Sequence, residues 1–547
     1  MLRRLLLALL TGLALAGPVQ AAKPDLVLMI TVDQLRGDMP WRLRDRFGSG
    51  GFRYLMDQGS SYTNAYLSHA VTITAAGHAT LATGGNTPEH GMAANKWFDS
   101  DARRPVYCTE DPNHPLIGER PGTSAGRSPA NLTSSTIGDE LVLASGGKSR
   151  VFSVSTKDRS AIIMGGRSGQ AWWYSTSTGQ YVTSTWYTDA YPDWVADWNK
   201  ARPADRFKGG AWTLLHDRSS YIFAEQDNRE FEKGEGVYGR TFPHTLDFGD
   251  DYTFYSVLRY SPMADELTLD FVRELVKAEK IGQRGHTDLL SISFSATDYV
   301  GHAFGPNSLE AEDNLLRLDR TLDELLRFID RKVGLDKTLV VLSADHGVAP
   351  APEHMAAMGF SAERHQPREF MAQANLALRE HFGVEQDLAI AFWKPGIYLD
   401  RKAIDSLGLQ AAEVERVLAR KIMRTDGFTL ALTRSDLMAG SIPGTEMARR
   451  VQASFHPARS GDVLLVHDPF WYLSEDPQGN AAMHGSPYTH DTHVPIMMAG
   501  PGIARTVVHR QVAPRDVAAT LSTYLGISPP SGSVGKPLTE VFGKDSP

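Results

Sequence analysis

Carboxylate and imidazole side chains follow short apolar runs at three widely separated places in this 547-residue chain. Asp33 directly follows LVLMITV, Asp345 and His346 follow LVVLSA, and Asp298 and His302 come shortly after DLLSISF. An apolar run that ends in a carboxylate predicts a buried parallel strand with a polar side chain at its carboxyl end. Open α/β sheets keep their active sites at this edge. We therefore expect these side chains to meet in one site.

Oxygen and nitrogen donors without a usable thiol are typical ligands of divalent cations, and this set favours two ions, with zinc as the metal. Asp298 and His302 can stand side by side, either one helical turn apart or through a loop at a strand end. Asp345 and His346 are adjacent, so their side chains can diverge toward two ions. Taken alone, the first pair is more often a structural ion pair and the second a turn. Their joint occurrence at successive strand ends favours a metal site.

Thr74 opens a predicted short helix of small residues, TAAGHATLAT at 74–83, which Gly84 and Gly85 end. Its hydroxyl, together with Asp33, would complete the ligand set of the second ion. The simpler interpretation of Thr74 is a helix-capping residue. The two interpretations differ in whether the hydroxyl points toward the cation cluster or away from it.

Apolar runs and helical patterns alternate along most of the chain, which predicts an α/β fold. Strands are expected at 25–32, 151–155, DLLSISF, TLVVLSAD and HVPIMMAG, and helices at 74–83, around 267–275, from 308 to near 334, and at DVAATLSTYLGI. The aromatic, Gly- and Ser-rich segment at about 166–255 and the irregular segment at about 350–480 interrupt this alternation, and we expect both to be cap insertions. The first is expected either to form a surface subdomain with its own small core or to contact substrate. Because the chemical residues run from 33 to beyond 480, we expect one core sheet with insertions over 23–547.

The chain begins with two arginines, an apolar stretch and small residues around Val19 and Ala21, which is typical of a secretory signal peptide covering 1–22. An uncleaved anchor is the alternative, and no later stretch is apolar enough to span a bilayer. Removal of Arg3 and Arg4 changes the net charge from −8 to about −10, which argues against a nucleic-acid partner. The single Cys108 excludes an intramolecular disulfide. An exported, cysteine-poor chain fits a bacterial periplasmic enzyme.

The motifs ITVDQ, VTITAAGHAT, STKDR, TDYVGHAFGP, SADHG and HGSPYTHDTHVP resemble those of the alkaline phosphatase superfamily. Within it, the chain is most similar to the single-threonine, phosphate-irrepressible alkaline phosphatases of bacterial envelopes, over nearly its whole mature length. The resemblance implies a three-layer αβα sandwich around a mostly parallel central sheet, with large cap insertions. It also implies two Zn²⁺ ions as cofactors and small-molecule phosphate monoesters as substrates.

The resemblance divides the metal ligands into two sets. One zinc would be held by Asp298, His302 and His484, and the other by Asp33, Asp345, His346 and the Thr74 hydroxyl. The third ligand of the first set is open, because His484, His490 and His493 all lie within HGSPYTHDTHVP. His484 is favoured because relatives place a ligand in a His-Gly pair ahead of an aspartate, and His490 is the alternative. His493, beside a strand start, is expected to be structural.

The resemblance also implies a mechanism. Thr74 would attack phosphorus and form a phosphothreonine, because zinc lowers the pKa of its hydroxyl and the amino end of its helix favours the alkoxide. Family spacing selects Thr74 over Thr72. Two zinc ions about 4 Å apart would hold the attacking and leaving oxygens in line. Asn95 would donate its amide to a phosphoryl oxygen, and Lys157 and Arg159, alternating along an extended strand end, would face the dianion together.

Three other functions compete with phosphate monoester hydrolysis. A phosphodiesterase or nucleotide pyrophosphatase of the same superfamily would keep Thr74 but replace Lys157 and Arg159 with a pocket for the second ester group. A sulfatase needs a Cys or Ser in a C/S-x-P-x-R setting, whereas the only cysteine lies in CTEDP. An envelope phosphate- or metal-binding protein on an inactive scaffold would have lost the nucleophile or a ligand. All these positions are filled here, and the two cations favour monoesters because a diester carries one charge fewer.

Overall fold

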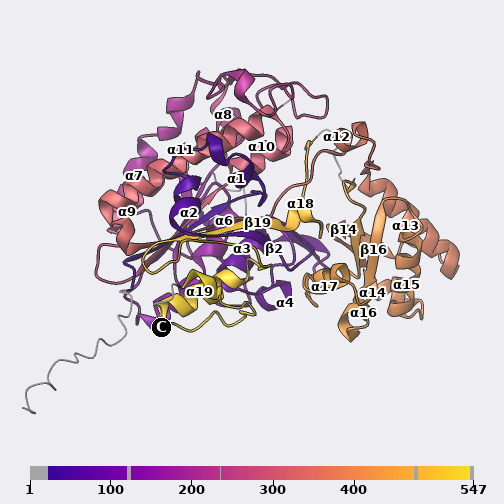
Figure 1. The fold of residues 1–547 in the computed structure, drawn as a ribbon. Helices are drawn as coiled ribbons and strands as arrows, with labels where there is room; N and C mark the ends of the chain where they lie inside the picture. The colour runs from indigo at the N-terminus through magenta and orange to yellow at the C-terminus, as the bar shows by residue number, and fades with distance from the viewer. Residues whose placement is uncertain (1–22, 120–124, 235, 474–478, 543–547) are drawn as a thin grey trace, which may run out of the picture.

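A large mixed sheet runs through the middle of the molecule in the computed structural model, which describes residues 23–119, 125–234, 236–473 and 479–542 (Figure 1). The predicted signal peptide at 1–22 lies outside these residues. The strands of the sheet are β1 (Leu26–Val32), β2 (Ser60–Tyr66), β5 (Leu116–Ile117), β6 (Val151–Ser155), β7 (Gln170–Tyr174), β8 (Tyr181–Ser184), β11 (Asp288–Phe294), β12 (Thr338–Ser343), β19 (His493–Ala499) and β20 (Thr506–Val508). Their order is β20-β2-β19-β12-β1-β11-β6-β7-β8-β5.

The centre of this sheet is parallel and its flanks are mixed. The neighbouring strands β12, β1, β11, β6 and β7 pair in parallel. β19 pairs antiparallel with β12 and β2, and β8 pairs antiparallel with β7 and β5. All residues of β1, β6, β11 and β12 are buried, as expected for strands that helices cover on both faces. The predicted mostly parallel central sheet is confirmed.

Helices cover both faces of the sheet and give the predicted three layers (Figure 1). Alternate residues of β1 point to opposite faces, so Leu28 and Ile30 belong to one apolar cluster and Val27 and Met29 to the other. The first cluster includes residues of α1 (Met39–Arg42), α2 (Phe52–Gln58), α7 (Asp193–Lys200), α8 (Asp251–Leu258), α9 (Met263–Glu279), α10 (Ala296–Phe304) and α11 (Leu309–Lys332). The second includes residues of α3 (Thr74–Thr83), α5 (Ile137–Ala144), α6 (Asp158–Gly165) and α19 (Asp516–Leu525).

The elements that carry the chemical residues form where the sequence predicts them. α3 spans the predicted 74–83 and ends at Gly84, which adopts a left-handed conformation with φ 69°. α11 begins after Ser308, whose side chain accepts a hydrogen bond from the Ala311 backbone N–H, and its leucines face the core. One boundary differs: α6 begins at Asp158, so Arg159 lies in the first turn of a helix and the predicted extended strand end stops at Lys157.

The aromatic segment 166–255 contributes to the main sheet and to its core. β7 and β8 lie within this segment and belong to the main sheet. Trp172 on β7 and Tyr181 on β8 are fully buried. Tyr181 stacks on Phe271 of α9 with ring centroids 4.2 Å apart. Trp212, in the short hairpin of β9 (Ala211–Trp212) and β10 (His244–Thr245), is also fully buried in the same cluster. These aromatic residues therefore share the core of the first face and do not form a separate one.

The segment 350–480 has a sheet and a core of its own (Figure 1). Its four-stranded sheet has the order β14-β15-β17-β16, with β14 (Ala389–Trp393), β15 (Gly396–Leu399), β16 (Phe428–Thr433) and β17 (Val463–His467). Its helices are α12 (Pro352–Ala357), α13 (Pro367–Phe382), α14 (Arg401–Ser406), α15 (Ala411–Ile422), α16 (Arg434–Ala439) and α17 (Glu446–Gln452). A pair of short strands, β13 (Arg364–His365) and β18 (Tyr472–Leu473), borders it. A helix–sheet layer of this kind is consistent with an insertion that folds beside the main sheet.

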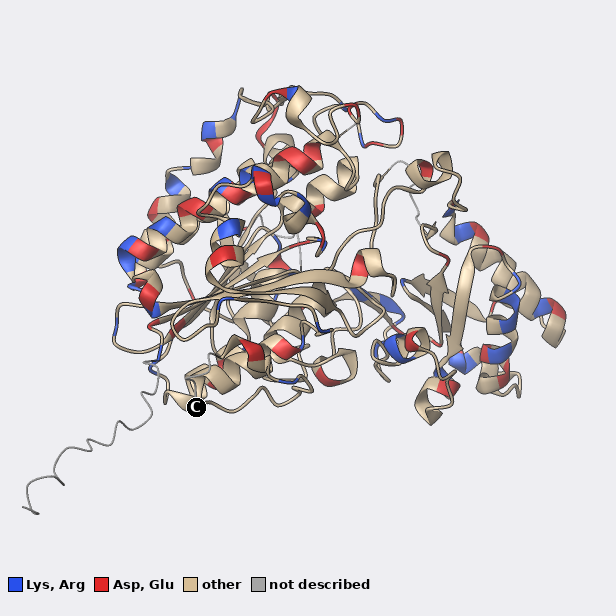
Figure 2. Ribbon diagram, in the orientation of Figure 1, with Lys and Arg blue, Asp and Glu red and all other residues tan. Residues whose placement is uncertain are grey.

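Charged residues lie mainly on the helices, and the central strands carry few of them (Figure 2). The remaining short elements connect the core to the site: α4 (Thr87–His90), the hairpin of β3 (Lys96–Asp99) and β4 (Arg104–Tyr107), and α18 (Thr489–Thr492). Within the described residues, none of the helices combines the length and the apolar character needed to cross a bilayer.

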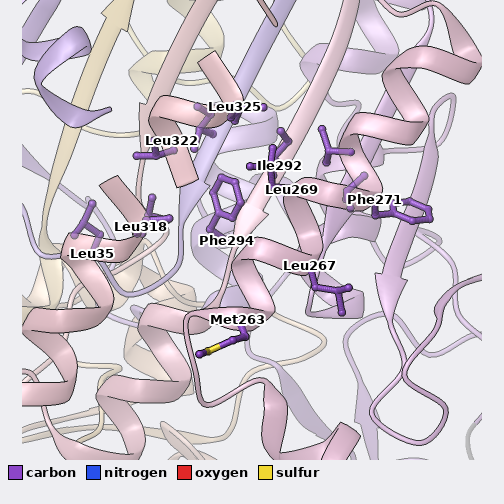
Figure 3. Close-up of a cluster of buried hydrophobic side chains, with 14 of the residues drawn as sticks. Leu35, Met263, Leu267, Leu269, Phe271, Ile292, Phe294, Leu318, Leu322 and Leu325 are labelled. Atoms are coloured by element: carbon purple, nitrogen blue, oxygen red, sulfur yellow. The ribbon is translucent and has the colours of Figure 1, made fainter. Parts of the chain in front are cut away.

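Replacement of Leu325 by alanine should destabilise the protein, because this α11 side chain is fully buried beside the central strands (Figure 3). A buried Leu→Ala change typically costs about 2–5 kcal/mol. Urea unfolding followed by circular dichroism measures the loss. Leu376→Ala on α13 is the control, since this leucine is 49% exposed and should change stability little. Equal effects of the two variants would contradict the proposed role of the α11 face.

Candidate active site

The carboxyl ends of β1, β11 and β12 bring the predicted residues together. The three strands pair in register, with Val32 opposite Phe294 and Thr31 opposite Ser343. Asp33 follows β1, Asp298 lies in the first turn of α10 after β11, and Asp345 lies two residues beyond β12. Each of these three carboxylates is at most 2% exposed. The sheet therefore delivers three buried acids to one edge, as expected for a parallel core.

Asp33, Asp345 and His346 form one group of possible metal ligands, with one ligand atom of each lying within 4.8 Å of the others. His346 Nε2 lies 3.6 Å from Asp33 Oδ1 and 3.4 Å from Asp345 Oδ2. Among the described residues, Asp33 Oδ1 and His346 Nε2 are buried without a hydrogen-bond partner. Buried polar atoms of this kind normally have a partner, so their convergence fits a bound cation.

Asp298 is the centre of the second group. His302 Nε2 lies 3.3 Å and His484 Nε2 lies 3.5 Å from Asp298 Oδ1. His302 is placed by α10, one helical turn after Asp298, which is the helical alternative of the two predicted arrangements. The imidazole of His346 stacks on His484 with ring centroids 3.6 Å apart, and Asp298, His346 and His484 also have ligand atoms within 4.8 Å of one another. His346 thus lies between the two groups.

The three histidines are held in the tautomer that can bind a metal. Nδ1 of His302 donates to Ala482 O, Nδ1 of His346 to Gly347 O, and Nδ1 of His484 to Thr72 O, at 2.7, 2.9 and 2.7 Å. A carbonyl oxygen can only accept, so each Nδ1 carries the proton and each Nε2 presents a lone pair to the site. Backbone carbonyls fix metal-binding histidines in this way.

The other two histidines of HGSPYTHDTHVP lie elsewhere. His493 Nε2 bonds to Thr63 O at 2.9 Å, and its ring stacks on Tyr66, which is a structural arrangement. His490 stacks on Phe470, and its Nε2 lies 3.4 Å from Ser486 Oγ. Neither belongs to the two groups of possible ligands found among the described residues. The geometry therefore favours His484 as the third ligand.

Thr74 is the first residue of α3 and is buried, and His78 lies between its carbonyl oxygen and Asp345. Arg159 Nη2 donates to the Thr74 hydroxyl at 3.3 Å, so the hydroxyl faces the site. Thr72, in contrast, donates its hydroxyl to Ser486 O at 2.9 Å. α3 can approach β12 closely because Gly77 has no Cβ, which would lie 2.0 Å from the Asp345 carbonyl oxygen. This close approach places Thr74 beside the ligands that follow β12.

Asn95, Lys157 and Arg159 surround the threonine. The side-chain Oδ1 of Asn95 accepts the Ala75 N–H at 2.9 Å, which leaves its side-chain NH₂ group to donate to a ligand. Lys157 Nζ lies 2.8 Å from Asp33 Oδ2 and 2.5 Å from Asp298 Oδ2, so it bridges the two groups of ligands. Burial opposes the charge of Lys157, but the two aspartates outweigh it and raise its pKa. Three carboxylates against two cations leave the site negative, and two divalent ions would make it positive.

Two residues in contact with the ligands were missed by the sequence analysis. Gln34 donates its backbone N–H to Asp345 Oδ1 at 3.1 Å and its side-chain amide to Asp298 Oδ1 at 2.8 Å, from a left-handed backbone with φ 69°. His78 Nδ1 lies 2.9 Å from Thr74 O and 3.1 Å from Asp345 Oδ2, and its Nε2 accepts from Ser293 Oγ. Both lie inside the quoted motifs ITVDQ and VTITAAGHAT, which were the only signal of their position.

Comparisons with known proteins agree with this arrangement. A family model described as type I phosphodiesterase / nucleotide pyrophosphatase matches residues 27–493. The alkaline phosphatase PafA of Elizabethkingia meningoseptica is 33% identical over 533 residues, 95% of each chain. The alkaline phosphatase PhoV of Synechococcus elongatus is 33% identical over 532 residues, 96% of this chain and 94% of PhoV. The crystal structure of wild-type PafA matches with a TM-score of 0.88 over 95% of this chain and 99% of that chain.

Replacement of His78 by glutamine should weaken metal binding at the Asp345 group, because it removes the imidazole that lies 3.1 Å from Asp345 Oδ2 and bonds to Thr74 O. Loss of a partner of a metal ligand typically costs about 10- to 100-fold in metal affinity. Competition with a chromophoric chelator measures the affinity, and a thermal melt reports whether the variant is folded. His286→Gln is the control, since His286 is exposed just before the amino end of β11, at the opposite edge of the sheet from the site. Wild-type affinity in a folded His78→Gln variant would contradict this role.

Proposed function

The chain belongs to the type I phosphodiesterase / nucleotide pyrophosphatase family of the alkaline phosphatase superfamily, and from this premise we propose that it is a zinc-dependent phosphate monoesterase that works through a phosphothreonine. It is an enzyme of the alkaline phosphatase type, a phosphoric monoester hydrolase, as its similarity to PafA and PhoV over almost its entire length indicates. The metal and the covalent intermediate are the finer part of the proposal. They rest on the chain's own residues.

The contact between Arg159 and the Thr74 hydroxyl is the observation that carries this proposal. It places a planar cationic donor next to a buried hydroxyl at a helix amino end. A guanidinium at this point can bind two oxygens of a phosphoryl group while the hydroxyl attacks phosphorus. A capping role for Thr74 does not account for this contact, because the N-cap of α3 is Ile73 and Thr74 is the first residue of the helix.

Two zinc ions fit the donor set, which offers carboxylate oxygens and neutral histidine nitrogens without a thiol. Asp298, His302 and His484 would hold one ion, and Asp33, Asp345, His346 and the Thr74 hydroxyl would hold the other. When bound, the ions would lower the pKa of the Thr74 hydroxyl and neutralise charge on the attacking and leaving oxygens.

The protein groups then have separate tasks in the reaction. Thr74 Oγ1 attacks phosphorus, the ester oxygen departs, and water later hydrolyses the phosphothreonine and regenerates the hydroxyl. Arg159 and the Asn95 amide orient the phosphoryl oxygens. Lys157 contributes a fixed positive charge between the ligand groups. Because phosphoryl transfer depends mainly on positioning and charge neutralisation, these groups account for most of the work left to the protein.

A diesterase is the second candidate, because the family description includes type I phosphodiesterases. Lys157 and Arg159 favour the monoesterase, since together with two divalent ions they give a positive site that suits a dianion. We propose that the protein acts in the bacterial periplasm on small-molecule phosphate monoesters, with no nucleic-acid partner. The predicted signal peptide supports the location, and the negative net charge of −8 argues against nucleic acid.

Thr74→Ala should remove nearly all turnover, a loss of at least about 1,000-fold in kcat, because no other side chain is placed to form the covalent intermediate. Hydrolysis of p-nitrophenyl phosphate by zinc-loaded protein measures the rate, and metal analysis shows whether zinc stays bound. Thr72→Ala is the matched control and should retain most of the activity. Near-normal turnover by the Thr74 variant would exclude Thr74 as the nucleophile.

Chelation of the bound metal should abolish activity, and added zinc should restore it. If zinc does not restore activity but another divalent metal does, the assigned cofactor is wrong.

Replacement of Lys157 and Arg159 by alanine should impair monoesters more than diesters, because a diester carries one negative charge fewer. The expected loss of kcat/KM for a monoester is about 100-fold or more, because each hydrogen bond to a charged group is worth about 1.5–3 kcal/mol. The loss for a diester should be several-fold smaller. The ratio of rates on p-nitrophenyl phosphate and bis-p-nitrophenyl phosphate measures the difference. Equal losses on both substrates would remove the argument for a monoesterase.

A further inference from the structure

Tyr299 lies between two cations beside the candidate site, Lys157 and Arg259. It follows Asp298 on α10, and its ring is half-buried. Lys157 Nζ lies 5.0 Å from the centroid of its ring, and the guanidinium carbon of Arg259 lies 5.1 Å from the same centroid. Since both are measured from one point, the two cations are at most about 10 Å apart. Positive charge therefore continues outward from Lys157, past Tyr299, to Arg259.

Arg259 is a cation without an acidic partner among the described residues. It follows the last residue of α8 and is half-buried, with its Nε atom buried and lacking a hydrogen-bond partner. Its neighbours are the rings of Tyr260, 5.1 Å away, and Tyr299. Burial opposes the charge of Arg259, but these tyrosines outweigh it and raise its pKa, so the guanidinium stays charged. By comparison, Arg127 is also partly buried but pairs with Asp158 at 2.8 Å.

Lys233 adds a second positive charge beside Arg259. Its Nζ lies 5.6 Å from the centroid of Tyr260, whose ring meets Tyr299 at a centroid distance of 5.3 Å. The backbone N–H of Lys233 donates to Ala303 O at 2.7 Å, which fixes this loop against α10. Lys233 forms no ion pair with the acidic groups that the structure describes. Two half-buried cations and two phenol rings thus form a ledge, defined by Lys233, Arg259, Tyr260 and Tyr299.

The ledge is joined to the Asp298 group of ligands through α10, which carries Asp298, Tyr299 and His302. In the proposed reaction Thr74 attacks from the Asp33, Asp345 and His346 group, so the leaving oxygen faces the Asp298 group. Tyr299 is the neighbour of Asp298 in the chain. A group attached a few bonds beyond the leaving oxygen would therefore meet Arg259. A guanidinium next to aromatic rings, with no carboxylate, is suited to a phosphoryl group.

We propose that Arg259 and Lys233, supported by Tyr260 and Tyr299, form a second anion subsite that selects phosphate monoesters whose leaving group carries another phosphoryl group. This inference rests on the proposed function, since it places the leaving group by the assigned role of Thr74. The subsite would bind the second phosphoryl group through charge-assisted hydrogen bonds from the guanidinium. The first phosphoryl group would stay with Arg159 and Lys157.

Two substrates with the same carbon chain test the subsite: propyl phosphate and trimethylene bisphosphate, which has a phosphate at each end of three carbons. Arg259→Gln should lower initial kcat/KM for the bisphosphate about 10- to 100-fold, because hydrogen bonds to charged groups are worth about 1.5–3 kcal/mol. The same variant should change kcat/KM for propyl phosphate less than about threefold, and Lys233→Gln should follow the same pattern with a smaller loss. The wild-type preference for the bisphosphate should weaken as salt is raised.

Two further variants make the outcome decisive. Arg259→Lys keeps the charge and should retain most of the bisphosphate preference, which a role limited to packing would not predict. Arg206→Gln removes an arginine that pairs with Asp270 away from the ledge and should change neither substrate. Equal losses on the two substrates, or no loss on the bisphosphate, would overturn the subsite. If wild-type enzyme fails to hydrolyse propyl phosphate at all, the proposed function fails instead, so the two failures are distinguishable.

Discussion

The burial of three carboxylates at one edge of the sheet is the constraint on which the rest of this structure depends. Asp33, Asp298 and Asp345 are almost completely buried, and buried charges are costly unless positive charge lies next to them. Burial and the nearby Asp345 together hold the pKa of Asp33 well above its usual range, although Lys157 opposes them. Lys157 and Arg159 together cannot neutralise three acids, so the arrangement is stable with all three ionised only if further positive charge binds. Divalent cations meet this requirement at the place where the histidine lone pairs converge.

Hydrogen bonds from the surrounding structure hold each group of the site in place. Backbone carbonyls set the tautomer of the three histidines, Gln34 bonds to carboxylates of both groups, and Asn95 is tied to the amino end of α3. Gly77 lets α3 lie directly against the end of β12. Catalysis by positioning and charge requires groups that do not reorganise during the reaction. The hydrogen bonds that hold the ligand side chains supply that rigidity. Ligands at strand ends and on short helices are well placed to receive such bonds.

The sequence predicts the strands and helices of the core well because these elements depend on local patterns. The apolar run DLLSISF can be buried along its whole length only as an internal strand, and the leucine spacing of α11 places its apolar side chains on one helix face. β11 and α11 therefore form as predicted. The role of His78 could not be predicted, since its partners Asp345 and Ser293 are distant in the chain. Similarly, the left-handed backbone of Gln34 has no local signal, because only the tertiary contacts hold it. The start of α6 also differs, since capping and packing decide whether the residue after Lys157 is extended or helical.

The two segments predicted as cap insertions both contact elements that carry ligands of the Asp298 group. Lys394, in the turn between β14 and β15, donates to the carbonyl of His484 at 2.6 Å. Its aliphatic chain lies against Gly485, where a Cβ would be 3.0 Å from Lys394 Cε. In the segment 166–255, the loop that precedes α8 is bonded to α10 through the backbone N–H of Lys233. Each segment therefore contacts the backbone of an element that carries a histidine of the Asp298 group. A change in either segment can alter that group without touching a ligand, which gives these segments a physical route to influence the leaving-group side of the site.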